Sequence, residues 1–522
     1  MGANLTILYE LMDKSVLYVK TRTRKELAIL SLIGVCCYFG GHYVIKKMYR
    51  KIKKYPPGPI GLPILGSMIS FGNNVDKFME YQTYYGEISF FRLGIHNACS
   101  LNSSKVSTQV LKNENCVGRI PIGFFSKAPI IGIIPGNNNW AMRRRVLMKS
   151  FIAALNSKYV SASADYSFSS NIFPKIDKII QNNGGVYYSR DDLLFLAFTT
   201  IFVSLTGDDP EKYPALMKDV IKGVDGWFVY FYELFGPALL PSMLPLFRIT
   251  GTIKKFSKAE EELMKCAANI IEIRKNIVKS GNYDKSIHSL IDDILESHHN
   301  GSDGYKDFES CQGDVIALMV AGLDTTLTVS EFTLFMLGKE PDLQEQIYNE
   351  LKQNFDVNKI SSINNCPLFR AFIHESMRKS NISAFGLPRY TTKNIKVKLD
   401  NNTEYNIPKN SIVFPNFLKI LDYFEYNRGK YESWVDSRSF NVNNFLDSNG
   451  KFKKTDSFVL FGTGKRDCLG RTLAYKHLWS VISGYILNYQ IKLKDINIEP
   501  TFHDGMTKKM DPQVPLILTK RK

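Results

Sequence analysis

The chain has 522 residues, of which 44% are hydrophobic and 12% aromatic, a composition typical of an ordered globular protein and not of a disordered chain. A formal net charge of +17 suits an anionic partner, such as a nucleic acid, a membrane surface or an acidic protein, although a solvated basic surface explains it equally well. The eight cysteines form no C-x-x-C pair and no zinc-like array with histidine, which argues against a disulfide framework or a zinc ribbon and favours a reducing compartment.

A membrane anchor is the first predicted element. The segment LAILSLIGVCCYFGGHYVI (27–45) contains no Asp, Glu, Lys or Arg, and its nineteen residues are long enough to cross the roughly 30 Å hydrocarbon core as a helix. It lacks a small-residue cleavage site, so we expect a retained anchor and not a signal peptide. More lysines and arginines follow the segment than precede it, which favours a cytosolic location for the rest of the chain. A buried helix or a membrane-surface helix is the alternative.

The anchor follows an N-terminal segment (1–26) and precedes a linker (46–66) that is basic and rich in proline and glycine. The closely spaced prolines and glycines from residue 53 onward exclude both a helix and a central strand. Apolar and polar residues alternate around a glycine-containing turn at 85–101, which predicts a β-hairpin. Helical spacing dominates from about Trp140 onward. The further predicted elements are helices at 311–337 and after Cys468, short strands at 395–397 and 412–415, and surface loops at 297–307 and 441–450.

Cys468 differs from the other cysteines in its surroundings, because it follows a glycine-rich loop and precedes a predicted helix. A phosphate-binding loop is not supported, since the segment lacks the glycine five residues before Gly464 and the Ser or Thr after the lysine. A catalytic thiol is possible at a helix start, but no histidine nearby is an obvious base. A thiolate metal ligand is the stronger interpretation, because the N–H groups and dipole of a helix start stabilise an anionic sulfur.

The neighbours of Cys468 fit a haem better than a bare metal ion. Gly464 allows a tight loop, and Gly470 lets the following helix press its backbone against a flat porphyrin. Arg466 can pair with a propionate carboxylate. Phe461 can cover the sulfur side of the ring and exclude water, which influences the redox potential of the iron.

The segment FGTGKRDCLG (461–470) matches, at every fixed position, the haem-binding signature of the cytochrome P450 family: Phe, two residues, Gly, one, Arg, one, Cys, one, Gly. Further similarities follow in the family's order: PPGP (56–59) resembles its hinge after the membrane anchor, WAMRR (140–144) its Trp-x-x-x-Arg haem contact, AGLDTT (321–326) its oxygen-activation motif, ESMR (375–378) its Glu-x-x-Arg pair, and Pro388-Arg389 its arginine facing the second propionate. The resemblance covers the chain from about residue 50 to its C-terminus. It implies a single catalytic domain at 67–522 that is mainly α-helical with small β-sheets.

The resemblance also implies the roles of individual residues. Cys468 would be the axial ligand of haem b (iron protoporphyrin IX), which Trp140, Arg144 and Arg389 would also contact. Asp324 and Thr325 would deliver protons to iron-bound dioxygen. Without the family, close helix packing is the commoner explanation of AGLDTT, and Trp140 and Arg144 are more simply a core aromatic residue and a surface arginine.

The chain departs from the family's pattern in two places. Where the family has Phe-x-Pro-x-Arg-Phe, this chain has FNVNNF (440–445), so Asn444 replaces the arginine that completes the buried charge network around Glu375. This substitution puts the stability of the network in doubt, and our hypothesis is that Arg428 or Arg438 takes the missing place. The family's His-Arg-Asp-Pro-like segment is unrecognisable at 421–424.

The implied function is a haem-thiolate monooxygenase that inserts one atom of dioxygen into a C–H bond or across a double bond, while the other atom leaves as water. The chain has no nicotinamide or flavin fingerprint, so the expected electron donor is a separate membrane-bound, NADPH-dependent flavoprotein reductase, for which a basic surface is suited. The expected location is the endoplasmic reticulum membrane, with a single span and a cytosolic catalytic domain. A nucleic-acid partner is not expected, because the basic residues form no array beyond the membrane flanks.

The substrate is expected to be lipophilic, such as a sterol, a fatty acid or a secondary metabolite. The aromatic, proline-broken segment 226–247 lies where the family forms its pocket roof, although a helix pair buried in the core explains it equally well. Other apolar residues in pocket-lining regions of the family are Phe124, Phe125, Ala384, Phe385 and Leu387.

Two other functions stay open. One is a haem-thiolate isomerase or dehydratase that needs no reductase, against which the Asp324-Thr325 pair argues. The other is a non-catalytic haem-binding protein or sensor, which only Asn444 suggests.

Overall fold

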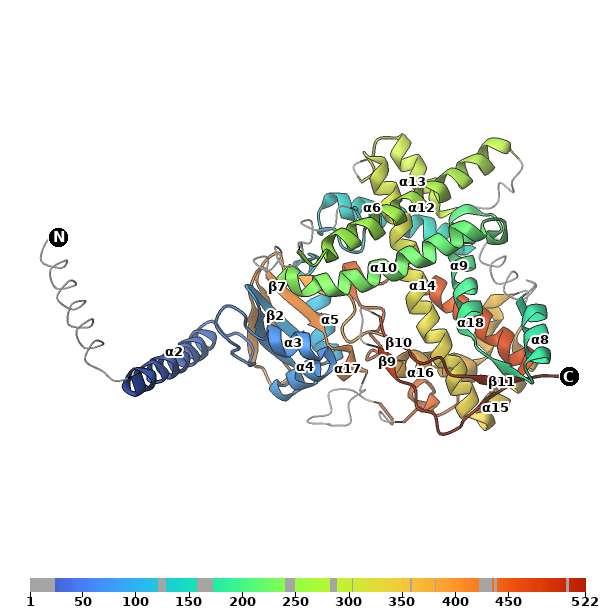
Figure 1. The fold of residues 1–522 in the computed structure, drawn as a ribbon. Helices are drawn as coiled ribbons and strands as arrows, with labels where there is room; N and C mark the ends of the chain where they lie inside the picture. The colour runs from blue at the N-terminus through green and yellow to red at the C-terminus, as the bar shows by residue number, and fades with distance from the viewer. Residues whose placement is uncertain are drawn as a thin grey trace, which may run out of the picture.

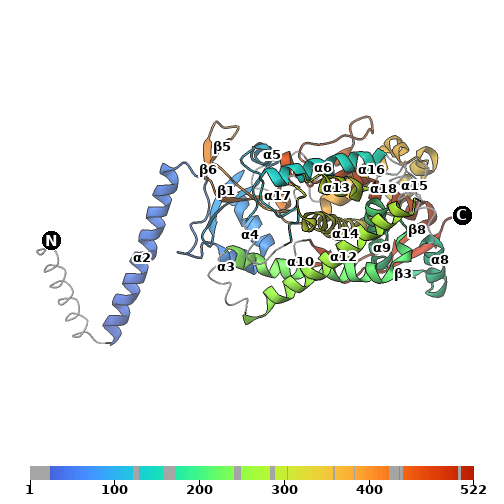
Figure 2. The same cartoon turned by 90° about the horizontal axis from the view of Figure 1, so that it is seen from above.

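The computed structural model describes residues 24–120, 128–156, 172–239, 249–281, 289–302, 304–356, 359–380, 382–421, 434–435, 439–503 and 507–522. Within these ranges the chain is mainly α-helical with small β-sheets, as predicted. Figure 1 and Figure 2 show the helix α14 (Phe308–Lys339) running through the middle of the helical part, and the largest sheet on the side from which the helix α2 (Arg24–Ile52) projects.

The remaining helices are α3 (Met68–Asn73), α4 (Val75–Gln82), α5 (Ser104–Lys112), α6 (Asn138–Asn156), α8 (Ile172–Asn182), α9 (Arg190–Thr206), α10 (Pro214–Leu239), α12 (Thr252–Ser280), α13 (Leu290–His299), α15 (Pro341–Asn354), α16 (Pro367–Lys379), α17 (Phe417–Ile420) and α18 (Arg471–Asn488). Short 3₁₀ turns lie at Thr83–Tyr85, Pro210–Lys212, Ile360–Asn365, Val442–Phe445 and Gly464–Arg466. The strands are β1 (Ile88–Leu93), β2 (His96–Leu101), β3 (Val186–Tyr187), β4 (Arg389–Tyr390), β5 (Ile395–Lys398), β6 (Glu404–Ile407), β7 (Ser411–Pro415), β8 (Tyr489–Leu493), β9 (Phe502–His503), β10 (Lys509–Met510) and β11 (Leu516–Lys520).

The central helix α14 confirms and slightly extends the helix predicted at 311–337. It begins after Asp307, whose carboxylate accepts a hydrogen bond from the Ser310 N–H at 2.8 Å, and it ends just before Pro341. Side chains are buried around most of its circumference, which is the pattern of a core helix. The helix α14 is also long and apolar enough to span a membrane, but 67% of its apolar stretch lies inside the protein, as in a core helix.

The predicted hairpin at 85–101 is formed by β1 and β2, which pair antiparallel across a turn at Gly94. The strand β7 pairs parallel with β2, and β4 pairs antiparallel with β7, so the sheet order is β1-β2-β7-β4. The strands predicted at 395–397 and 412–415 correspond to β5 and β7. A second sheet has the order β3-β11-β8, and two-stranded pairs are formed by β5 with β6 and by β9 with β10.

The two predicted surface loops are only partly at the surface, so that prediction is wrong in part. In 297–307, Tyr305 is fully buried and its hydroxyl donates to the Asp314 carboxylate at 2.6 Å. In 441–450, Asn444 and Phe445 are buried. The polar composition of both stretches predicted exposure. These side chains are nevertheless buried, because they are hydrogen-bonded to carboxylates inside the protein or pack in the core.

The described part of the 226–247 segment forms the end of α10 and supports the buried-helix interpretation. Trp227 and Phe231 are buried, and the Trp227 ring lies 6.0 Å from the ring of Phe256 on α12. Val229 and Tyr232 on the same helix are exposed. Residues 240–247 of this segment, Phe124, Phe125, Arg428, Arg438 and 422–424 lie outside the described residues.

Candidate functional site

A cavity of about 380 Å³ lies between α14 and the segment that leads into α18. Its walls bring together residues from distant parts of the chain, including α6, α9, α14, α18 and the stretch before β4. The predicted site residues that line it are Trp140, Arg144, Thr325, Arg389, Phe461, Arg466, Cys468 and Gly470. Asp324 and Gly464 are not among its lining residues, and of the predicted substrate contacts Phe385 and Leu387 line it whereas Ala384 does not.

The Cys468 side chain is accessible from this cavity. Its backbone N–H donates to the Phe461 carbonyl at 2.8 Å, which fixes the loop around the cysteine. Burial by the surrounding protein raises the pKa of the thiol, while the hydrogen bond from the Gly470 N–H and the charge of Arg471 act to lower that pKa. A neutral thiol at this position would therefore become a stable thiolate once a metal cation faces the sulfur.

The two glycines around Cys468 have different roles. Gly464 has a φ of +74°, and a Cβ atom there would lie 2.3 Å from the Leu111 carbonyl oxygen, so a side chain is excluded in this tight turn. Gly470 has no atom within 4 Å of the position of a Cβ and lines the cavity. The backbone at the start of α18 is therefore open to the cavity, as close approach to a flat ring requires.

Among the described residues, four arginines line the cavity: Arg119, Arg144, Arg389 and Arg466. Burial and the neighbouring guanidinium groups lower the pKa of Arg466 to about 8 and that of Arg119 to about 9. Asp467 is the one carboxylate among the described cavity residues, and it pairs with Arg144. The cavity therefore has an excess of positive charge, which favours the binding of a group that carries more than one negative charge.

Backbone carbonyls hold these guanidinium groups in place. Arg466 donates to the carbonyls of Val117 at 2.9 Å, Ile131 at 3.1 Å and Ile134 at 2.8 Å. Arg389 donates to two carbonyls at 2.6 Å, those of Leu111 and Thr463. The guanidinium of Arg466 also lies 3.9 Å from the centre of the Trp140 ring.

Arg119 was missed by the sequence analysis. Its guanidinium donates to the carbonyls of Gly132, Leu387 and Pro388 at 2.8 Å each. The only signal in the sequence is an arginine within the otherwise apolar stretch VGRIPIG (117–123), which by itself does not indicate a partner.

Asp324 and Thr325 lie on different sides of α14. Thr325 lines the cavity, and its hydroxyl donates to the Ala321 carbonyl at 2.7 Å. The Asp324 carboxylate is buried and forms an ion pair with Lys509 at 2.9 Å. Burial raises the pKa of Asp324, and Lys509 acts to lower it. A Cβ atom on the adjacent Gly322 would lie 2.4 Å from Ile201 of α9, so the small residues of this motif do serve close helix packing.

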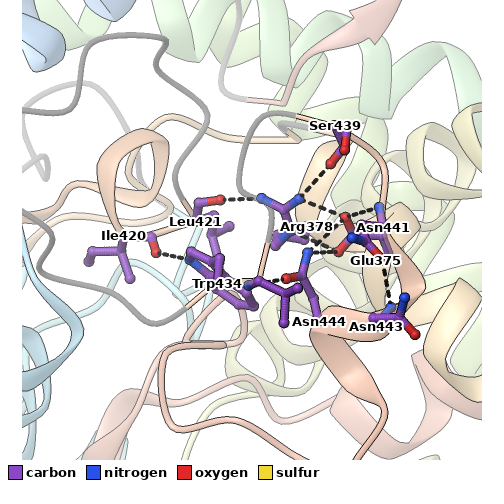
Figure 3. A network of polar contacts seen from close by, with 10 residues as sticks. Glu375, Arg378, Ile420, Leu421, Trp434, Ser439, Asn441, Asn443 and Asn444 are labelled. Carbon is purple, nitrogen blue, oxygen red and sulfur yellow. Dashed lines mark hydrogen bonds and ion pairs between the residues drawn. The ribbon is translucent and has the colours of Figure 1, made fainter. Parts of the chain in front are cut away.

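Glu375 and Arg378 on α16 form a fully buried ion pair (Figure 3). The Arg378 guanidinium donates to the two Glu375 oxygens at 2.8 Å and 2.6 Å, and to the Leu421 carbonyl at 2.8 Å. The Asn444 amide donates to both Glu375 oxygens at 3.2 Å, and the Asn441 N–H donates at 2.8 Å. Asn444 is therefore itself part of the network. Our hypothesis that Arg428 or Arg438 takes the place of the family's arginine stays a prediction, because both residues lie outside the described ones.

The site fits a haem. A sulfur faces the cavity at a helix start, cationic side chains provide partners for two propionates, and the Gly470 backbone leaves room for a flat ring. A cysteine sulfur at an apolar cavity edged by arginines, in a mainly helical domain, is the arrangement of a haem-thiolate protein.

The chain belongs to the cytochrome P450 family, whose family model matches residues 56–516. It is similar to cytochrome P450 18a1 of Drosophila melanogaster, with 23% identity over 91% of this chain and 88% of the relative. It is also similar to probable cytochrome P450 508C1 of Dictyostelium discoideum, with 27% identity over 87% and 92% of the two chains, and to cytochrome P450 2D10 of Mus musculus, with 24% identity over 82% and 85%. Members of the family are generally monooxygenases with a haem-thiolate cofactor.

Proposed function

We propose that the protein is a haem-thiolate monooxygenase that inserts one atom of dioxygen into a lipophilic substrate, with electrons from a separate membrane-bound, NADPH-dependent flavoprotein reductase. The observation that supports this proposal most directly is the cavity that joins Cys468, the arginine cluster and Thr325. Bound haem b would supply a redox-active, thiolate-ligated iron at which dioxygen is reduced.

The residues of this chain would hold the cofactor in defined ways. Cys468 is the proposed iron ligand, and Phe461 would shield its sulfur from water. Arg144, Arg389 and Arg466, with Arg119 in addition, would bind the propionates, and Trp140 would support Arg466 by stacking.

Thr325 is the proposed proton-transfer group at the cavity wall, and Asp324 is the proposed acid behind it. A hydroxyl can both accept and donate a hydrogen bond, so Thr325 can hold a water and pass a proton to the reaction site. The apolar residues Leu318, Phe385 and Leu387, which also line the cavity, favour a lipophilic substrate.

The monooxygenase proposal is tested with purified protein, a flavoprotein reductase, NADPH, ¹⁸O₂ and a panel of lipophilic compounds. We expect substrate-dependent NADPH consumption and one ¹⁸O atom in the product. Thr325→Val keeps the shape of the side chain but removes its hydroxyl, and we expect product formation to fall on the order of 100-fold. Thr333→Val is the matched control, because the Thr333 hydroxyl makes the same type of bond, to the Val329 carbonyl on α14, at 2.6 Å.

Two outcomes would contradict the monooxygenase proposal. Product formed without reductase or NADPH would identify an isomerase or dehydratase. A haem-loaded protein that consumes no NADPH with any compound would favour the non-catalytic haem-binding or sensor function.

We further propose that residues 27–45 anchor the protein in the endoplasmic reticulum membrane as a single span. In this arrangement 1–26 is a terminal segment, 46–66 a linker, and 67–522 a cytosolic catalytic domain. The exposed apolar side chains on α2 support the anchor, and they include Ile29, Ile33, Phe39, Val44 and Ile45. At the end of α2, Arg50 donates to the carbonyls of Gly58 at 2.9 Å and Pro59 at 3.0 Å, so the linker is tied to the helix.

The double variant Ile33→Lys, Phe39→Lys is expected to move the full-length protein from the carbonate-resistant membrane fraction to the soluble fraction. A lysine near the centre of a span costs about 2.5–3.5 kcal/mol, so two of them exceed what the remaining apolar residues offset. Ile496→Lys is the control, since Ile496 is an exposed residue outside α2. Unchanged membrane retention of the double variant would contradict the anchor.

A further inference from the structure

Asp324 is held from outside the cavity by a short segment near the C-terminus, residues 507–510. The Lys509 ammonium lies 2.9 Å from one carboxylate oxygen, and the Thr507 hydroxyl donates to the other. The Asp324 side chain is 3% exposed, whereas that of Lys509 is 37% exposed. The buried acid thus contacts a residue that reaches solvent.

Lys509 also connects Asp324 to a third element. Its ammonium lies 2.7 Å from the carboxylate of Asp225, a residue of α10 whose side chain is 56% exposed. One lysine therefore bridges a buried acid on α14 and an exposed acid on α10. Figure 1 shows α10 crossing α14 and the strands β9 and β10 beside α14.

The backbone of the 507–510 segment is fixed independently of Lys509. The Lys508 N–H donates to the Ile382 carbonyl at 2.9 Å, and the Thr328 hydroxyl donates to the Lys508 carbonyl at 3.0 Å. The Lys508 ammonium pairs with Asp76 of α4, and Arg190 of α9 donates to the Met510 carbonyl. Loss of the Lys509 charge would therefore leave the segment in place and remove only the ion pairs with Asp324 and Asp225.

We infer that Lys509 is a positioning residue that orients the Asp324 carboxylate and makes its orientation depend on the contact between α10 and the 507–510 segment. This inference rests on the proposed function, in which Asp324 supplies protons to Thr325. Lys509 does not line the cavity, so it acts through Asp324 and not on the substrate.

The test compares Lys509→Met, Lys509→Arg and Asp225→Asn in the full-length protein. Lys520→Met is the matched control, because Lys520 is also near the C-terminus and pairs with Asp177 on a different helix, α8. Hydrogen exchange of the α10 and α14 amides is measured first, since this readout does not require turnover. We expect exchange to be about 5- to 30-fold faster in Lys509→Met, up to about five-fold faster in α10 of Asp225→Asn, and unchanged in Lys520→Met.

The second readout is the amount of product per NADPH consumed. We expect Lys509→Met to lower this ratio several-fold with an unchanged KM, and Lys509→Arg to restore it. If hydrogen exchange and the amount of product per NADPH in Lys509→Met both equal those in Lys520→Met, the inference is overturned. Turnover by the wild type would still leave the proposed function intact. If instead the wild type has no turnover, the proposed function fails. The positioning role is tested separately, because unchanged hydrogen exchange in α10 of Lys509→Met would overturn it.

Discussion

Replacing Cys468 with alanine is expected to abolish the strongly red-shifted Soret band of the dithionite-reduced, carbon monoxide-treated protein. This band would depend on a thiolate ligand to the haem iron, and Cys468 is the one cysteine among the described residues that lines the cavity. The measurement is the absorption spectrum of the purified variant beside that of the wild type.

The control for this experiment is Cys37→Ala, which removes an exposed cysteine on α2, a helix that contributes none of the described residues lining the cavity. We expect its spectrum to equal that of the wild type. If Cys468→Ala also retains the red-shifted band, or if the wild type binds no haem, the assignment of the axial ligand is wrong.

Replacing Arg378 with methionine is expected to lower the free energy of unfolding by about 3–5 kcal/mol. The substitution leaves the fully buried Glu375 carboxylate without its cationic partner, and a buried, uncompensated charge is costly. The Asn441 backbone N–H and the Asn444 side-chain amide would still donate to Glu375, so the carboxylate keeps two of its hydrogen-bond donors. Denaturant unfolding of the haem-loaded protein measures the difference.

Lys258→Met provides the contrast, because Lys258 and Glu262 form an exposed i,i+4 pair whose loss costs about 0.5 kcal/mol or less. A double variant, Glu375→Leu with Arg378→Met, is expected to be more stable than Arg378→Met alone, since removing both charges removes the unpaired one. Equal losses in Arg378→Met and Lys258→Met would show that the pair contributes little to stability.

Local sequence patterns predicted the parts of the fold that depend on neighbouring residues. The hairpin of β1 and β2 follows from alternation around a glycine turn, and α14 follows from an unbroken apolar run. The segment around Cys468 could also be recognised, because a haem-binding loop places its required residue types within ten positions.

Contacts between distant segments could not be predicted in this way. Arg119 joins the arginine cluster through carbonyls more than 260 residues away along the chain, at Leu387 and Pro388. Asp324 pairs with Lys509, a residue from a distant part of the chain that the motif around Asp324 does not indicate. Asn444 breaks the family's pattern, yet its amide reaches Glu375, and composition alone had placed it in a surface loop.

The pairing of Asp324 with the 507–510 segment has a consequence for synthesis of the protein. Asp324 and Thr507 are 183 residues apart, so at ordinary translation rates the acid is made about 10 to 40 s before its partners. During that interval the Asp324 carboxylate lacks the Lys509 and Thr507 side chains that contact it in the folded protein, so its burial carries a desolvation cost that these contacts later offset. The surroundings of Asp324 are therefore completed only after residues 507–510 have left the ribosome.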